Sequence, residues 1–169
     1  MTSEQSTREL VKSLATKLPK FPDGRINYSQ SDVAPVVTVF IECDGKILLL
    51  KRNEKMRNYP GKWNAVTGYI DEVVPVKEKV LEELREETGI TEKEIASIRY
   101  GEPYEMKDEQ LRKTWVIHPV LVKMNVRPEI KLDQEHTECL WIAPEELSRF
   151  DTPPRLDESL NRVLRRRVR

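Results

Sequence analysis

The sequence predicts an α/β protein, and two observations carry this prediction. Residues 34–43 and 46–51 are apolar, β-branched runs separated by Asp44-Gly45, a dipeptide that strongly indicates a tight β-hairpin. Residues 77–88 continue a pattern in which apolar side chains recur every four positions, which is typical of an amphipathic helix. A chain of 169 residues is long enough to bury the core of one domain of ordinary size.

Residues 1–33 are expected to form a short N-terminal helical extension that precedes the main domain, residues 34–169. Ser6 or Thr7 is a candidate N-cap of a helix in this extension. The apolar side of that helix would consist of Leu10, Val11, Leu14 and Leu18. Prolines and a glycine in residues 17–31 are typical of a linker or an extended arm. The extension either packs on the domain or covers a substrate or a dimer partner.

The two strands of the expected hairpin are apolar without alternation, so we expect both faces of the sheet to be covered. The loop that follows, residues 52–63, is basic and contains Pro60-Gly61. Residues 64–71 are expected to form a short strand that leads into the helix.

Beyond the helix, residues 95–105 and 112–124 are expected to pair as antiparallel strands around a polar tip, residues 107–110. Pro119 lacks the N–H that a strand donates, so we expect its strand to lie at a sheet edge or to contain a bulge. The remaining expected elements are a strand at residues 138–142, a helix that begins at Pro144 and a last helix at residues 156–168.

Composition argues against several classes of protein. The 29 basic and 29 acidic residues cancel, so no net charge favours nucleic acid, and RNA binding by the basic residues 164–169 is the less favoured alternative. The longest apolar run, residues 47–50, is far too short to cross a bilayer. The N-terminus lacks the apolar core of a signal peptide. We therefore expect a cytoplasmic protein in which Cys43 and Cys139 are reduced, buried thiols.

The helix at residues 77–88 carries Glu83, Glu86 and Glu87 at a spacing that places their carboxylates close together. Such a cluster is either a solvated helix face or a site for a multivalent cation, because carboxylate oxygens suit Mg²⁺ or Mn²⁺. Gly89 directly after the helix is a typical stop signal.

The segment Gly68–Ile90, GYIDEVVPVKEKVLEELREETGI, resembles the Nudix box of the MutT-like hydrolases, G-x5-E-x7-R-E-U-x-E-E-x-G-U, in which U is a bulky aliphatic residue. Seven required positions match without a gap: Gly68, Glu83, Leu84, Glu86, Glu87, Gly89 and Ile90. Two positions depart from the pattern, because Val74 replaces its first glutamate and Glu82 replaces its arginine.

The resemblance implies an α/β/α sandwich with a mixed sheet. It also implies a hydrolase that uses water to cleave a diphosphate bond in a nucleoside diphosphate linked to another moiety. Glu83, Glu86, Glu87 and the backbone carbonyl of Gly68 would hold Mg²⁺ or Mn²⁺. Family members usually recruit a further carboxylate as base or ligand, and here Glu135 is expected in that role, with Asp133 and Glu138 as its competitors.

The two departures keep alternatives open. The family's box arginine pairs with a glutamate and holds the catalytic carboxylates, which Glu82 cannot do. Arg85, Arg52 or Lys79 could offset Glu82, and Asp71 or Glu72 could replace the carboxylate that Val74 lacks. A second hypothesis is therefore a Nudix-fold module that binds a nucleotide or protein partner with weak or no turnover. Isoprenyl diphosphate isomerisation is less favoured, because it needs a nucleophilic cysteine and Cys43 falls inside an expected strand.

Candidate substrate contacts are Arg52 and Lys62, which could hold phosphate oxygens, and Trp63, which could stack on a base. The alternatives are solvated charges for the first two residues and core packing for the third. The expected partner is a small nucleotide; its identity stays open, as does a homodimer, an arrangement common in the family.

Overall fold

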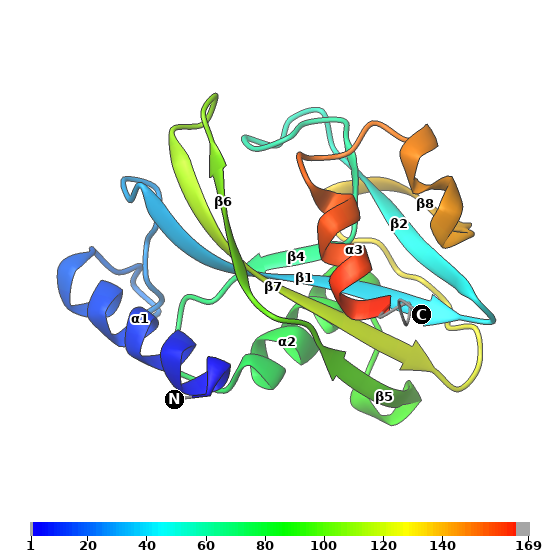
Figure 1. Ribbon diagram of the computed structural model, residues 1–169, viewed down its shortest axis with the longest axis horizontal. Helices are drawn as coiled ribbons and strands as arrows, with labels where there is room; N and C mark the ends of the chain where they lie inside the picture. Colours follow the sequence, from blue (N-terminus) through cyan, green and yellow to red (C-terminus); the bar gives the residue numbers. More distant parts are fainter. Residues whose placement is uncertain (1, 165–169) are drawn as a thin grey trace, which may run out of the picture.

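Eight strands form one mixed sheet with helices on both faces in the computed structural model, which describes residues 2–164 (Figure 1). The strands are β1 (Val33–Cys43), β2 (Lys46–Arg52), β3 (Trp63–Asn64), β4 (Val66–Tyr69), β5 (Ile95–Tyr100), β6 (Tyr104–Asp108), β7 (Lys113–Met124) and β8 (His136–Ile142). The helices are α1 (Ser3–Lys17), α2 (Val76–Thr88) and α3 (Leu156–Leu164), with short 3-10 helices η1 (Glu92–Glu94) and η2 (Pro144–Arg149). The predicted α/β fold is confirmed.

The centre of the sheet is β1, which runs parallel to β7 and antiparallel to β2 and β4. The predicted hairpin joins β1 to β2, with φ of 52° at Asp44 and 76° at Gly45. Positive φ at both central residues is what a type I′ turn requires, and this turn matches the twist of the paired strands.

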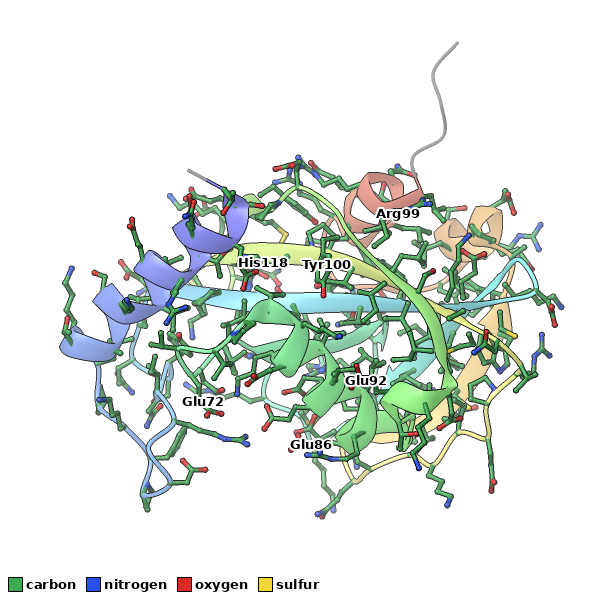
Figure 2. The ribbon with its side chains drawn as sticks, turned by 90° about the horizontal axis from the view of Figure 1, so that it is seen from below. Glu72, Glu86, Glu92, Arg99, Tyr100 and His118 are labelled. Carbon is green, nitrogen blue, oxygen red and sulfur yellow. The ribbon has the colours of Figure 1, made fainter. Side chains whose placement is uncertain are left out.

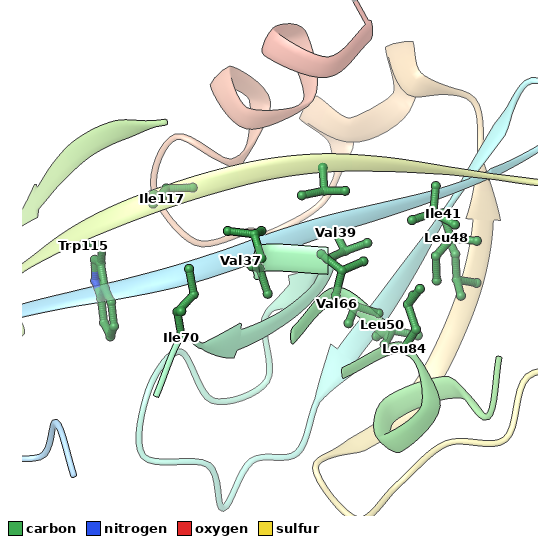
Figure 3. Close-up of a cluster of buried hydrophobic side chains, with 14 of the residues drawn as sticks. Val37, Val39, Ile41, Leu48, Leu50, Val66, Ile70, Leu84, Trp115 and Ile117 are labelled. Atoms are coloured by element: carbon green, nitrogen blue, oxygen red, sulfur yellow. The ribbon is translucent and has the colours of Figure 1, made fainter. Parts of the chain in front are cut away.

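The two faces of β1 bury different side chains, because successive residues of a strand point to opposite sides. On one face, Val37 and Val39 share an apolar core with Leu84 of α2 (Figure 3). On the other face, Phe40 shares a second core with Leu160 of α3. Figure 2 shows α2 and α3 on opposite sides of β1 and β7. The expected α/β/α sandwich is therefore present, and it explains why the strands are apolar on both faces.

Pro119 lies inside the sheet, so its predicted position at an edge or a bulge is wrong. Its strand, β7, pairs with β1 on one side without a bulge and with β5 and β6 on the other. The expected strand at residues 95–105 is interrupted between β5 and β6, where Gly101 N–H donates to the Pro119 carbonyl at 2.9 Å. The N–H and C=O of a strand residue point to the same side, so an N–H at Pro119 would point to this interruption. The missing N–H of Pro119 therefore falls where the pairing of the strands is already broken.

The N-terminal helix begins earlier than expected, because Thr2 caps it and not Ser6 or Thr7. The Thr2 hydroxyl accepts from Gln5 N–H at 3.1 Å, and the Gln5 side chain accepts from Thr2 N–H at 2.8 Å, which forms a capping box. The extension packs on the sheet through Val11 and Tyr28, which are 1 % and 2 % exposed. A domain boundary at residue 33 stays a prediction.

Three smaller expectations change. Cys43 is buried as expected, but Cys139 is exposed, because it lies on the outer strand β8; both are free thiols. Pro144 begins a 3-10 helix and not an α-helix. The last helix is described up to Leu164, so its expected continuation to residue 168 and the basic C-terminus lie outside the described residues. No helix within residues 2–164 has the length and apolarity to cross a membrane.

Candidate active site

A cavity of about 850 Å³ brings together most of the residues singled out in the sequence. Its walls come from the N-terminal segment at residues 25–32, the loop at 56–59, strands β4, β6 and β7, helix α2, and residues 153–156 before and at the start of α3. The predicted site residues that line it are Arg52, Gly68, Glu83, Glu86, Glu87 and Glu135. These residues are scattered over the sequence, and the fold places them around one space.

Helix α2 presents its carboxylates to the cavity because its apolar stripe faces the sheet. Val80 and Leu84 are completely buried, and Glu83 and Glu87 follow this stripe by three positions each. The helix ends at Gly89, whose φ of 77° is the left-handed conformation of a C-cap. The expected helix, stripe and stop are therefore confirmed. Glu86 is exposed on α2 (Figure 2).

Gly68 of β4 allows Glu83 to approach the strand backbone. A Cβ atom at Gly68 would lie only 2.2 Å from Cδ of Glu83, a distance that real atoms do not reach. The glycine is needed here for close contact and not for an unusual φ. The Glu83 carboxylate and the backbone of Gly68 are therefore neighbours on the cavity wall.

Burial and mutual repulsion raise the pKa of the two inner carboxylates. Burial, followed by the charges of Glu86 and Glu82, raises the pKa of Glu83 to about 7. The pKa of Glu87 is also raised well above its usual value, mainly by burial and then by the charge of Glu83. Glu87 is 2 % exposed, and neither of its carboxylate oxygens accepts a hydrogen bond from any residue in the range 2–164. Such an arrangement is costly unless a cation occupies it.

These residues fit a divalent metal ion. The buried oxygens of Glu87 lack partners, the Glu83 carboxylate is adjacent, and hard oxygen donors suit Mg²⁺ or Mn²⁺. Glu135 can bring a ligand oxygen within 4.8 Å of one from Glu87. Of its two expected competitors, Asp133 lines the cavity, whereas Glu138 lies outside it and pairs with Lys51 at 3.4 Å.

His136 is a residue of this site that the sequence did not reveal. Its side chain is 0 % exposed, with Nδ1 2.8 Å from the Asp133 carboxylate and Nε2 3.4 Å from Oε1 of Glu87. The available signal was its place directly after Glu135, but nothing in the sequence paired it with the distant helix α2.

Lys79 compensates the negative charge that Glu82 adds to the helix. Its ammonium group lies 2.9 Å from Glu82, 2.5 Å from Asp71 and 2.6 Å from Glu72, although its side chain is only 2 % exposed. These carboxylates raise the pKa of Lys79 against the lowering effect of burial. Lys79 was one of the expected partners of Glu82. It also pairs with Asp71 and Glu72, the two carboxylates that were expected to compensate for the glutamate missing at Val74.

Arg25 is the second partner of Glu82, and it comes from the N-terminal extension. Its guanidinium donates to the Glu82 carboxylate at 2.5 Å across 57 residues of sequence. Within residues 2–164 neither Arg85 nor Arg52 pairs with Glu82. The extension is therefore fastened to α2 next to Glu83.

The three expected substrate contacts are placed differently. Arg52 lines the cavity, is 8 % exposed and donates to the Asn58 carbonyl at 2.9 Å, and no carboxylate of the described residues pairs with it. Lys62 pairs with Asp151 at 3.0 Å outside the cavity lining. Trp63 also lies outside the lining and packs edge-to-face on Phe150, with 5.6 Å between ring centres.

Aromatic side chains form another part of the wall. Tyr28 of the extension stacks on Tyr69, the neighbour of Gly68, at 5.4 Å, and Tyr69 lies 6.0 Å from Trp115. Tyr59 donates to Asp108 at 2.5 Å and so joins the loop at residues 56–59 to the hairpin of β6 and β7. The extension and this loop therefore both shape the cavity.

Comparison with known proteins gives consistent matches. The model of the NUDIX domain family matches residues 32–166. The nucleoside triphosphatase NudI of Escherichia coli O139:H28 is 25 % identical over 121 residues, which cover 69 % of this chain and 86 % of that protein. A MutT protein from Methanosarcina mazei Go1 has a TM-score of 0.64 and 27 % identity, covering 81 % of this chain and 96 % of the other. The NUDIX domain of Shewanella oneidensis NrtR, solved with ADP ribose, has a TM-score of 0.57 and 18 % identity, covering 78 % and 87 %.

Proposed function

The chain belongs to the NUDIX domain family, and on this premise we propose that it is a hydrolase that requires Mg²⁺ or Mn²⁺ and cleaves a diphosphate bond by attack of water on phosphorus. The family generally hydrolyses nucleoside diphosphates linked to another moiety. The observation that carries the proposal is the buried Glu87 carboxylate, whose oxygens have no hydrogen-bond donor although Glu83 lies beside it. A metal ion is the partner that best satisfies both.

Each residue of the site has a defined role in this proposal. Glu83, Glu86, Glu87 and the carbonyl of Gly68 would hold the ion. A bound ion would neutralise diphosphate oxygens and acidify a water molecule. Glu135, which is exposed at the cavity, would act as base or as an additional ligand. The guanidinium of Arg52, which pairs with no carboxylate of residues 2–164, would hold phosphate oxygens and orient the diphosphate. No observation supports substrate contacts by Lys62 or Trp63.

The cavity and the relatives suggest nucleotides as substrates. About 850 Å³ lies within the range of small-molecule sites. NudI is described as a nucleoside triphosphatase, and the NrtR domain was solved with ADP ribose. We therefore propose a small nucleotide as the substrate. A cytoplasmic location, which the free thiols Cys43 and Cys139 support, and a homodimer remain proposals.

The proposal is tested by hydrolysis assays on nucleoside triphosphates, ADP ribose and other sugar nucleotides, and dinucleotide polyphosphates. Turnover should require Mg²⁺ or Mn²⁺, stop with a chelator and be abolished by Glu87→Gln. The matched control is Glu78→Gln, because Glu78 is an exposed residue of the same helix outside the cavity lining. Full activity of Glu87→Gln would refute the metal site.

A silent panel would favour the second hypothesis of a binding module, provided that a nucleotide of the panel still raises the melting temperature. The departures at Glu82 and Val74 motivated that hypothesis. The pairing of Glu82 with Lys79 and Arg25 supports the hydrolase instead, because it removes an unpaired negative charge from beside Glu83.

A further inference from the structure

We propose that His136 is a nitrogen ligand of the metal site, so that the protein binds an ion such as Mn²⁺, Co²⁺ or Zn²⁺ more tightly than Mg²⁺. This inference rests on the proposed metal site at Glu87 and assigns it a further ligand and a class of ion. Neither the box pattern nor the expected carboxylate at Glu135 involves a histidine.

The contact with Asp133 defines the tautomer that a neutral His136 ring adopts. Its Nδ1 lies 2.8 Å from Oδ1 of Asp133, and a carboxylate oxygen accepts a proton but does not donate one. The proton of the neutral ring therefore sits on Nδ1, and Nε2 carries a lone pair. Histidines that bind metals through one ring nitrogen usually donate the other N–H to a carboxylate or carbonyl in this way.

The lone pair faces the carboxylate of Glu87. Nε2 of His136 is 3.4 Å from Oε1 of Glu87, and both side chains are almost completely buried. Neither atom has a hydrogen-bond partner in the part of the chain that the structure describes. Leaving a buried polar atom unsatisfied costs about 1–3 kcal/mol. A single cation between the two side chains would satisfy both.

The separation also fits a shared ion. Metal–nitrogen and metal–oxygen bonds of about 2.0–2.2 Å place two ligand atoms of one ion roughly 3.0–3.5 Å apart. The observed 3.4 Å lies in this range, and one ligand atom from each of Glu87, Glu135 and His136 lies within 4.8 Å of the other two. The carboxylates are therefore not alone at this site, because a buried imidazole nitrogen without a partner among residues 2–164 lies beside them.

An imidazole in the ligand set changes which ion is preferred. Mg²⁺ takes oxygen ligands and keeps several waters, whereas imidazole suits later divalent transition metals. The competing interpretation is an imidazolium that bridges Asp133 and Glu87 without binding a metal. The two differ in whether Nε2 carries a proton.

The direct test is ¹⁵N NMR of histidine-labelled protein, first without metal and then with Zn²⁺, which is diamagnetic. The chain contains two histidines, and Nε2 of His118 lies 2.7 Å from the Thr7 hydroxyl, so His118 is an internal control. We expect an unprotonated Nε2 in His136 that shifts on addition of Zn²⁺ and saturates at one ion per chain, while His118 does not change. A proton on both ring nitrogens of His136, with no response to Zn²⁺, would refute the inference.

Calorimetry of His136→Gln provides a second test, with His118→Gln as the control and circular dichroism as the check of folding. The affinity for Mn²⁺ or Zn²⁺ should fall at least about 10-fold and that for Mg²⁺ much less. Equal losses for all ions would refute a nitrogen ligand. Suppose that the wild type binds the ions, that Glu87→Gln lowers their affinity, and that the NMR signals of His136 do not change when metal is added. In that case only this inference fails. If no ion binds to the wild type, the proposed function fails with it.

Discussion

Replacing Lys79 with methionine removes the one charge that three carboxylates share. Methionine keeps an unbranched apolar stem, so the buried contacts of the side chain are largely preserved. What is lost is an ammonium group that lies 2.5 Å from Asp71, 2.6 Å from Glu72 and 2.9 Å from Glu82. Arg25 still pairs with Glu82 and Glu72, but Asp71 keeps no cation among residues 2–164. Removing one partner of a buried ion pair costs about 3–5 kcal/mol, because the remaining charge is left uncompensated. We expect Lys79→Met to lower the free energy of unfolding by this amount.

The matched control is Lys77→Met on the same helix. The Lys77 side chain is 53 % exposed and its single ion pair, with Glu92 at 3.1 Å, lies at the surface. Exposed pairs contribute about 0–1 kcal/mol, so this variant should unfold almost like the wild type. Urea unfolding can be followed through the fluorescence of the three tryptophans. For a domain of this size the expected loss in Lys79→Met lowers Tm by roughly 6–20 °C.

A double-mutant cycle tests the mechanism of the effect. Adding Asp71→Asn to Lys79→Met removes the carboxylate whose ion pair among residues 2–164 is with Lys79 alone, so the double variant should lose less stability than the sum of the two single losses. If Lys79→Met costs no more than Lys77→Met, the buried ammonium is not needed to compensate these carboxylates, and the reasoning is refuted.

Two further predictions follow from contacts already described. Gly68→Ala places a Cβ atom 2.2 Å from Cδ of Glu83, so the Glu83 carboxylate must move. We expect metal-dependent hydrolysis to fall about 100-fold in a folded protein, since a displacement of a site group by about 1 Å has such an effect. Activity close to that of the wild type would contradict this. Burial lowers the pKa of His118, so the unfolded state binds more protons below about pH 6.5, and stability falls with falling pH by at most about 1.4 kcal/mol per pH unit. His118→Gln should remove this contribution. The measurement is the free energy of urea unfolding of variant and wild type from about pH 5 to pH 8, and the difference between the two should change with pH. A difference independent of pH would contradict the prediction.

Local patterns in the sequence were sufficient for elements whose cause is local. The Asp44-Gly45 turn depends on two residues that tolerate positive φ, and helix α2 depends on an apolar repeat and on Gly89. The clustered carboxylates of α2 belong to the same class, because residues three and four positions apart on a helix are always neighbours. The family resemblance added Gly68, whose contact with Glu83 spans two elements.

Other features depend on how distant segments pack. Pro119 indicates an edge strand by itself, but the interruption between β5 and β6 lets β7 lie in the middle of the sheet. Glu82 looks like a loss of the box arginine until Arg25 is brought to it from the extension. His136 has a local partner in Asp133, but its contact with Glu87 forms only because β8 and α2 converge.

The sequence by itself therefore determined the class of fold and the helix with its carboxylates, since turn preferences and side-chain periodicity act over a few residues, and the resemblance to the box indicated the family. Only the tertiary structure decided which charges are compensated, which of the candidate residues line the cavity and which imidazole nitrogen lies beside Glu87. Contacts between segments far apart in the chain are set by the packing of the whole core, and no local pattern encodes them.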